Sequence, residues 1–319
     1  MLPEMADDGL DLRPATAEDR RAIVELAARS LGWAGDDRDA AWFSWKHDHN
    51  AHGASPSWVA EDDGRIVAFR TLLRWRFERG YDAIDVVRAV DTATDPDYQG
   101  RGLFTRLTMR AVDELTAAGV AAVFNTPNSQ SRPGYLKMGW RELGRPTLSV
   151  RPSSIGGVRK LVTARTSADK WSEPVSVGAS AVEALADPAL PALLAALPAP
   201  DGWSTPRSLE HLRWRYGFEP LHYRAVEAGG GLVVFRVRKR GGAREVTVVE
   251  WLAPKPDPGA LKRLVKSAGD YAVGVGLGWR NRTVPFPRQG PIVTWRTLAR
   301  TEVPDLSDLD LSLGDLELL

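Results

Sequence analysis

The chain has 319 residues, about twice the length of an ordinary domain, so its length predicts two domains or one large one. Hydrophobic residues make up 43% of the sequence and charged residues 26%, which excludes a chain that stays disordered for lack of apolar side chains. The formal net charge of +1 argues against a dedicated nucleic-acid binder, and the absence of cysteine excludes disulfides, thiolate metal sites and a cysteine nucleophile.

The N-terminal eight residues place acidic side chains before any apolar run, so we expect neither a signal peptide nor a basic transit peptide there. The most apolar stretch, residues 179–200, contains Glu183, Asp187 and four prolines. It therefore cannot supply the roughly 20 uninterrupted apolar residues of a membrane span. We expect a cytoplasmic protein that has neither a membrane nor a nucleic acid as a partner.

The first 150 residues alternate helical and strand patterns at short intervals. Thr16 to Asp19 resembles a capping box, and apolar residues then recur at helical spacing as far as Leu31. Residues 58–73, with a turn at 62–64, predict a β-hairpin. The remaining predicted elements are a strand over 84–94, a helix over 103–117, a strand over 120–125 and a short helix before Gly139. This order predicts an α+β fold.

The second half of the chain repeats the first loosely. Trp45-Lys46 and Trp214-Arg215 are followed by similar strand segments, in which Glu61 and Phe69 are as far apart as Glu227 and Phe235. We interpret this as a duplicated architecture. A chance match is the alternative, since strand segments share residue types.

The most specific motif lies between the strand over 84–94 and the helix over 103–117, and reads Thr-Asp-Pro-Asp-Tyr-Gln-Gly-Arg-Gly-Leu-Phe from Thr94 to Phe104. Its glycines let the backbone approach a ligand closely, and the free N–H groups at a helix start favour phosphate. The loop therefore predicts an anion site. It is not a P-loop, because no Gly-Lys-Ser/Thr follows, and it does not fit a dinucleotide fingerprint.

At this loop the sequence resembles the GNAT superfamily of acyl-CoA-dependent N-acyltransferases. The family signature Gln/Arg-x-x-Gly-x-Gly/Ala reads Gln-Gly-Arg-Gly-Leu-Phe over 99–104, with Phe104 in place of Gly or Ala. Downstream, residues 128–140 look like the family's Asn-x-x-Ala-x-x-Leu-Tyr-x-Lys-x-Gly-Phe. The resemblance covers about residues 10–150 and implies a mixed, mostly antiparallel central sheet flanked by helices.

The domain organisation follows from this resemblance. Residues 1–150 are expected to form a GNAT N-acyltransferase domain. Residues 151–175 lack sustained periodicity and are predicted to be a linker. Residues 176–319 are expected to form a degenerate GNAT-like domain, because they lack both motifs and the prolines of Lys255-Pro-Asp-Pro258 cannot present the same amides. This second domain is expected to shape the acceptor cleft without binding CoA.

The resemblance implies that acetyl-CoA binds at the loop as a co-substrate and that no metal is required. Amides from about Gly100 to Thr105 would hold the pyrophosphate, and the strand over 92–94 would pair with the pantetheine arm. The residues implied in cofactor binding are Thr92, Ala93, Thr94, Gln99, Gly100, Arg101, Gly102, Leu103, Phe104, Thr105 and Asn128.

The resemblance also implies an acid and a base. Tyr135 matches the tyrosine that protonates the departing CoA thiolate, which suits a phenol because its ordinary pKa of about 10 keeps it protonated at neutral pH. Asp91 lies where many members carry a glutamate assigned as the base, and an alkylamine is only about a thousandth deprotonated at pH 7. The alternatives are a packing role for Tyr135 and a surface or hydrogen-bonding role for Asp91.

Two further segments have distinctive patterns. Three histidines, His47, His49 and His52, lie close together, and in an extended chain His47 and His49 share a face, which suits a metal. Their Gly/Ser/Pro-containing stretch instead favours a loop that is solvated or contacts the acceptor. Residues 309–318 alternate acids with leucines, which predicts a closing strand with an acidic face.

The sequence thus predicts an N-acyltransferase that moves an acetyl or other acyl group from acetyl-CoA directly to a primary amine. The acceptor is expected to be a small-molecule or peptide amine, and the oligomeric state stays open. A non-catalytic acyl-CoA-binding or regulatory protein, and a transferase that uses another acyl donor, are the alternatives.

Overall fold

A computed structural model of the chain describes residues 9–34, 36–299 and 302–317. Residues 1–8, on which the expectation about targeting peptides rests, lie outside the described residues. The chain forms two compact units. Unit 1 comprises Met1–Arg76, Ile84–Arg141 and Thr294–Val303, and unit 2 comprises Phe77–Ala83, Glu142–Val293 and Pro304–Leu319.

The strands of the first sheet are ordered β1-β2-β3-β4-β5-β14-β6. The elements associated with this sheet are β1 (Asp11–Pro14), α1 (Arg20–Leu31), α2 (Asp37–His47), β2 (Ser57–Asp62), β3 (Arg65–Arg79), β4 (Asp82–Thr94), the 3-10 turn Pro96–Tyr98, α3 (Leu103–Ala117), β5 (Ala122–Asn125), α4 (Arg132–Lys137), β6 (Arg141–Gly144) and β14 (Val293–Thr297). The predicted hairpin, the strand that follows it, the long helix and the short helix before Gly139 are confirmed.

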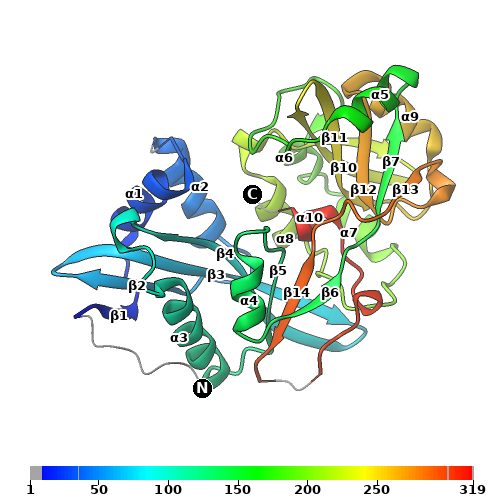
Figure 1. The fold of residues 1–319 in the computed structure, drawn as a ribbon. Coiled ribbons are helices and arrows are strands. Elements are labelled where there is room, and N and C mark those ends of the chain that lie inside the picture. Colours follow the sequence, from blue (N-terminus) through cyan, green and yellow to red (C-terminus); the bar gives the residue numbers. More distant parts are fainter. Residues whose placement is uncertain (1–8, 35, 300–301, 318–319) are drawn as a thin grey trace. The chain divides into compact units, whose positions relative to one another are not determined.

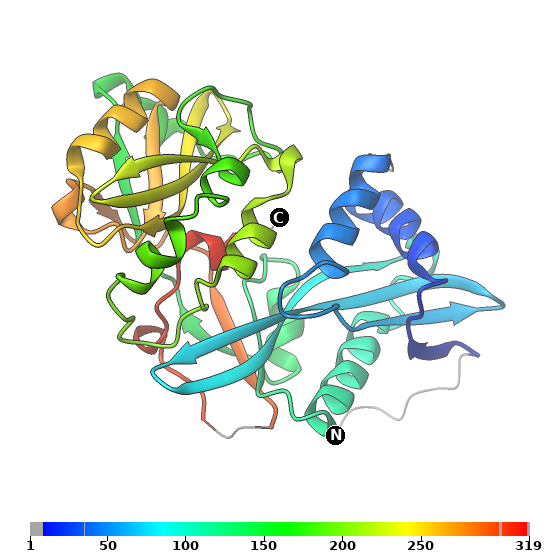
Figure 2. The same cartoon turned by 180° about the vertical axis from the view of Figure 1, so that it is seen from behind.

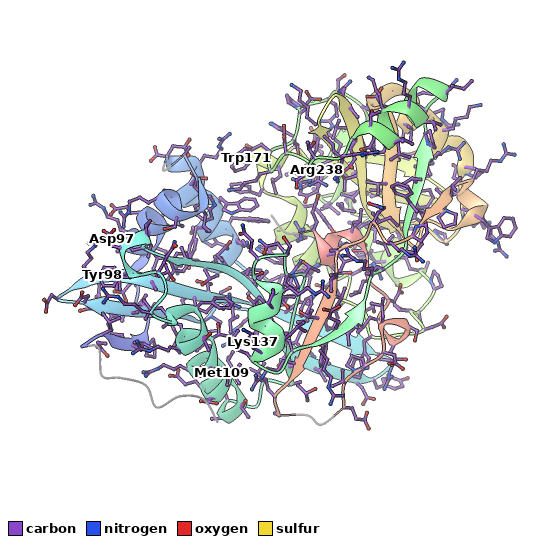
Figure 3. All side chains as sticks on the ribbon, viewed as in Figure 1. Asp97, Tyr98, Met109, Lys137, Trp171 and Arg238 are labelled. Carbon is purple, nitrogen blue, oxygen red and sulfur yellow. The ribbon has the colours of Figure 1, made fainter. Side chains whose placement is uncertain are left out.

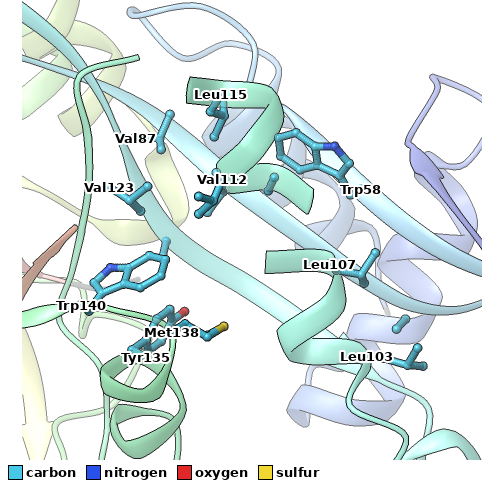
Figure 4. Close-up of a cluster of buried hydrophobic side chains, with 14 of the residues drawn as sticks. Trp58, Val87, Leu103, Leu107, Val112, Leu115, Val123, Tyr135, Met138 and Trp140 are labelled. Atoms are coloured by element: carbon cyan, nitrogen blue, oxygen red, sulfur yellow. The ribbon is translucent and has the colours of Figure 1, made fainter. Parts of the chain in front are cut away.

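Helices cover both faces of this sheet (Figures 1 and 2). Successive strand residues point to opposite faces, so Trp58 and Ala60 pack in the cluster that includes α3, whereas Val59 packs in the cluster that includes α1 and α2. In α3 the buried residues Leu103, Leu107, Ala111 and Leu115 recur every fourth position and face the sheet, as Figure 4 shows for the labelled leucines. The alternation of strand residues and the helical spacing in α3 thus decide which side chains enter the core on each face of the sheet.

The parallel pairing of β4 with β5 ends early. The two strands pair only over Val86–Arg88 and Ala122–Phe124, whereas β4 continues to Thr94. Pro127 follows β5 closely, and proline has no N–H with which to extend the ladder. Within the described residues, the last part of β4 therefore has no ladder partner on the side of β5.

The second sheet has the strand order β13-β7-β12-β11-β10-β9-β8. Its elements and those around it are β7 (Leu148–Pro152), α5 (Ile155–Thr163), β8 (Ala179–Ser180), α6 (Ala181–Ala184), α7 (Leu190–Ala195), α8 (Leu209–Tyr216), β9 (Arg224–Ala228), β10 (Gly231–Arg240), β11 (Ala243–Leu252), α9 (Pro258–Ala268), β12 (Tyr271–Val275), β13 (Val284–Phe286), α10 (Leu313–Leu316) and the 3-10 turns Glu219–Leu221, Trp279–Asn281 and Leu306–Asp308. In the described part of the chain no helix is long and apolar enough to cross a membrane.

The two sheets repeat one architecture, as the sequence echo predicts. The run β2-β3-β4-β5 corresponds to β9-β10-β11-β12, with α3 and α9 respectively joining the last two strands. These last two strands are parallel in both sheets, and the ladder ends at Arg88 in the first and at Thr247 in the second. The second module is therefore a repeat of the first in topology.

The modules exchange their last strands. β7 follows β6 in the chain but pairs with β12, and β14 follows β13 but pairs with β5. Because of this exchange the units are not the consecutive segments 1–150 and 176–319.

Two local expectations are corrected by the structure. Part of the segment expected as a linker, 151–175, completes β7 and forms α5, which Ser154 caps by accepting a hydrogen bond from the amide of Gly157. The C-terminal residues form the short helix α10 rather than a strand, because Ser312 and Asp315 make a capping box that outweighs the alternation of the leucines.

A fragment that ends at residue 150 tests the strand exchange. It lacks β14, so the edge of β5 loses its antiparallel partner and Phe124 loses the ring of Trp295. We expect it to lack the cooperative thermal transition of the full chain, measured by circular dichroism. As a control, residues 1–146 joined to 291–303 by a flexible Gly/Ser linker should regain that transition. A fragment that unfolds cooperatively at the Tm of the full chain would contradict the exchange.

Candidate active site

A cavity of ≈ 530 Å³ lies where β4 ends and α3 begins. Eight of the eleven residues implied in cofactor binding line it, together with Ser30, Leu31 and Tyr98, which sequence analysis did not assign. The lining residues are Ser30, Leu31, Thr92, Ala93, Thr94, Tyr98, Gln99, Gly100, Gly102, Leu103 and Phe104. Leu31 belongs to the helical apolar pattern of α1 but stays 41% exposed, since it faces this cavity instead of the core.

The loop that closes the cavity requires its glycines. Gly100 and Gly102 have φ of +80° and +70°, in the left-handed region that side chains disfavour. Gly102 precedes α3, and its carbonyl accepts the hydrogen bond of the Thr105 amide. The amides of Leu103 and Phe104 come before this first intrahelical bond and are therefore available to an anion.

Tyr98 anchors the same loop from the side of β2. Its hydroxyl donates a hydrogen bond to Asp62, and this bond raises the pKa of Tyr98. Figure 3 labels Tyr98 beside Asp97, whose amide donates to Asp95 at 3.2 Å. The guanidinium of Arg101 lies 4.6 Å from the centre of the Tyr98 ring, so Arg101 packs on the loop rather than lining the cavity.

The other two implied cofactor residues lie elsewhere. The Asn128 side chain accepts hydrogen bonds from the amides of Gln130 and Ser131 and so shapes the turn before α4. Thr105 lines a second cavity, of ≈ 570 Å³, with Met109 and Lys137, which Figure 3 labels. The complete lining of this second cavity is Thr105, Met109, Lys137, Met138, Gly139, Arg141, Trp295, Arg296, Thr297 and Val303.

Tyr135 lies on α4 and is 3% exposed. Its hydroxyl oxygen accepts a hydrogen bond from Nη2 of Arg70 at 2.6 Å. Its ring packs edge-on against Phe104 at 5.4 Å, and Figure 4 shows it beside Trp140 in the core. Tyr135 itself does not line the first cavity, but its contact partner Phe104 does. The phenylalanine that replaces the family's small residue thus connects the tyrosine to the cavity.

Asp91 is bound by two basic side chains of α2. Nζ of Lys46 and Nε2 of His47 both lie 2.8 Å from Oδ2 of Asp91. Burial alone would raise the pKa of Asp91, but the charge of Lys46 and the hydrogen bond from His47 outweigh it and hold this pKa well below its usual range. A carboxylate with so low a pKa accepts protons poorly. The geometry therefore favours the hydrogen-bonding role for Asp91 over the role of base.

The expectation of a histidine loop is wrong for His47. This residue ends α2 and is fully buried, and burial lowers its pKa although Asp91 opposes the change. His52 instead packs its ring on Trp75 at 5.7 Å. Among the residues that the structure describes, no group of three or more His, Cys, Asp or Glu side chains could hold a metal ion.

Unit 2 repeats this geometry with different chemistry. Glu250 lies three residues beyond the end of its parallel ladder, as Asp91 does, and lines a cavity of ≈ 1030 Å³ in that unit. In place of a glycine, Asp257 caps α9 by accepting the hydrogen bond of the Ala260 amide at 2.8 Å. That carboxylate takes up a helix-start amide and repels phosphate, which supports the expectation that this module does not bind CoA.

Several known proteins are similar to this chain. Residues 11–143 match the family model of the acetyltransferase (GNAT) domain. Three solved structures resemble the chain in fold over 91% of its length: a probable N-acyltransferase from Enterococcus faecalis V583, a GCN5-related N-acetyltransferase from Kribbella flavida and Eis1 from Mycobacterium abscessus. Their TM-scores are 0.62, 0.58 and 0.55, their identities 12%, 16% and 14%, and the matches cover 73%, 72% and 73% of those chains. No curated protein matches the sequence.

Removing the Asp91 carboxylate tests its role in stability. Because the pKa of Asp91 is lowered in the folded chain, its ionised form stabilises the fold above the ordinary pKa of about 3.9, and this stabilisation is lost as the pH falls below that value. Asp91→Asn should lower the free energy of unfolding at pH 7 by about 3–5 kcal/mol, since it removes the carboxylate that forms an ion pair with the buried Lys46. Urea unfolding from pH 7 down to pH 3 measures both effects.

The exposed Asp82 on the same strand provides the control. Asp82→Asn should change the free energy of unfolding by less than about 0.5 kcal/mol. If Asp91→Asn proves as mild as Asp82→Asn, Asp91 does not stabilise unit 1.

Proposed function

Because residues 11–143 carry the acetyltransferase domain and place the chain in the GNAT superfamily, we propose that it transfers an acetyl or other acyl group from CoA directly to a primary amine. The observation that supports this best is the cavity of ≈ 530 Å³, which combines the first amides of α3 with the end of β4 that, within the described residues, has no ladder partner on the side of β5.

These two features suit the two parts of CoA. The amides of Leu103 and Phe104 would bind the pyrophosphate, because free N–H groups and the helix dipole both favour an anion. Thr92 to Thr94 would offer backbone donors and acceptors to the extended pantetheine arm, much as a strand accepts a new partner at an open edge. The thioester would then lie beyond the end of the β4–β5 ladder.

In the proposed reaction the amine nitrogen attacks the thioester carbonyl. A C–N bond forms, the carbonyl oxygen becomes an oxyanion, and the intermediate collapses by breaking the C–S bond. The thiolate takes a proton from the Tyr135 hydroxyl. The low pKa of Asp91 and its bonds to Lys46 and His47 argue against it as the base, so the proposal assigns the proton of the amine to water.

A second candidate function follows from the same bonds. Since Asp91 is occupied by Lys46 and His47, unit 1 offers no ready carboxylate base at this position. A protein that binds acyl-CoA without turnover would need none. For the enzyme, the acceptor is proposed only as a class, a small-molecule or peptide amine.

A release assay for the CoA thiol, run with acetyl-CoA across small-molecule and peptide amines, separates the two functions. The transferase should release thiol only when an accepted amine is present. Tyr135→Phe should then lower kcat by about 10²- to 10⁴-fold, the usual contribution of general acid catalysis. CoA binding without thiol release from any amine would favour the binding protein.

A charge placed at the start of α3 tests where CoA binds. Gly102 has open space around the position of a Cβ, and among residues with side chains Asp and Asn best tolerate its left-handed φ of +70°. Gly102→Asp should abolish the rise in Tm that CoA produces, because the carboxylate repels the pyrophosphate as Asp257 would in unit 2. The neutral, isosteric Gly102→Asn should keep most of that rise. Equal effects of the two variants would place the pyrophosphate elsewhere.

A further inference from the structure

Arg70 is a buried cation that has no acidic partner among the residues that the structure describes. Its side chain lies on β3, is 0% exposed, and donates to the hydroxyl of Tyr135 and, at 3.3 Å, to the carbonyl of Val90. Its guanidinium also lies 5.5 Å from the ring centre of Tyr135 and 5.6 Å from that of Phe104. None of these groups is a carboxylate. Among the described residues, no acid forms an ion pair with Arg70.

The repeated module contains the matching arginine. Arg236 follows Phe235 on β10, as Arg70 follows Phe69 on β3, and it too is 0% exposed. Its Nη2 and Nε atoms, however, lie 2.6 and 2.9 Å from Oε1 of Glu317. Unit 2 thus neutralises its buried arginine with a carboxylate, whereas unit 1 places a phenol against its own.

This difference needs a physical reason, because an unneutralised buried charge is costly. The cost is offset if a negative charge develops next to the cation during the reaction. Such a charge appears when Tyr135 gives up its proton, since the phenolate oxygen then lies next to Nη2 of Arg70. Arg70 donates to the phenol oxygen, and the hydroxyl proton has no acceptor among the described residues. That proton is therefore free to be transferred.

We infer that Arg70 and Tyr135 act as one unit, in which Arg70 orients the phenol and stabilises the phenolate. The inference rests on the proposed function. When the C–S bond of the tetrahedral intermediate breaks, its electron pair goes to sulfur and the proton of the Tyr135 hydroxyl completes the thiol. The amine nitrogen gives its surplus proton to water before the intermediate collapses, and the phenolate stays beside the guanidinium until a proton from water restores the phenol. Arg70 acts through Tyr135 and is therefore a positioning residue.

A double-mutant cycle tests this inference on acetyl-CoA and an amine that the wild type accepts. Arg70→Met should lower kcat by roughly 10- to 100-fold, as expected for loss of a hydrogen bond to a charged group, with little change in the KM for acetyl-CoA. Arg70→Lys, which keeps the charge, should recover part of kcat. In a Tyr135→Phe background Arg70→Met should have almost no further effect, since the two residues act together.

Arg236→Met is the matched control. It removes the equivalent buried arginine and its ion pair with the buried Glu317, which keeps a second ion pair with Arg238 at 3.1 Å, so it should lower the Tm at least as much as Arg70→Met does and leave kcat per folded molecule unchanged. A normal kcat for Arg70→Met, or effects of Arg70→Met and Tyr135→Phe that multiply, would overturn the inference alone. A wild-type chain that acylates no amine would overturn the proposed function, and the inference with it. If Arg70→Met does not fold, the cycle is run with Arg70→Lys. A loss of kcat that disappears in the Tyr135→Phe background then supports the inference, and effects that multiply overturn it.

Discussion

The early end of the parallel ladder between β4 and β5 is the constraint on which the rest of the site depends. Backbone groups beyond Arg88 have no partner on β5, and buried groups of this kind must be satisfied by side chains, water or a ligand. Along this stretch Thr92 donates its hydroxyl proton to the Phe69 carbonyl at 2.9 Å, and Asp91 is held by α2. The cavity of ≈ 530 Å³ lies at this end of β4, beside Thr92 to Thr94.

The same constraint recurs in unit 2, where the nearby carboxylates of Glu250 and Asp257 disfavour phosphate. There Glu250 accepts hydrogen bonds from Tyr216 and Arg207 at 2.9 and 3.0 Å, and Asp257 occupies the start of α9. Both modules thus bury a carboxylate at the same place after the ladder. They differ in whether a glycine or an aspartate precedes the helix, and this decides the sign of the charge that the helix start can accept.

Local patterns predicted the parts of the site that neighbouring residues determine. The glycines at 100 and 102, the helix after them and the strand before them follow from turn chemistry and periodicity, and all of them meet at one cavity. Tyr135 was assigned from its motif. No motif indicates Arg70, because nothing in a run of alternating residues shows that one arginine is buried against a distant phenol.

By itself the sequence determined the hairpin, the strand before the glycine loop, the helix after it and the repetition of one architecture, since each depends on residues close together in the chain or on a pattern that occurs twice. Only the tertiary structure decided that β7 and β14 are exchanged between the two sheets, that Lys46 and His47 bind Asp91, and that Arg70 faces Tyr135 with no acid among the described residues to neutralise it. These features depend on pairing and desolvation between residues far apart in the chain. Periodicity describes which face of an element is buried, but it does not describe what that face meets.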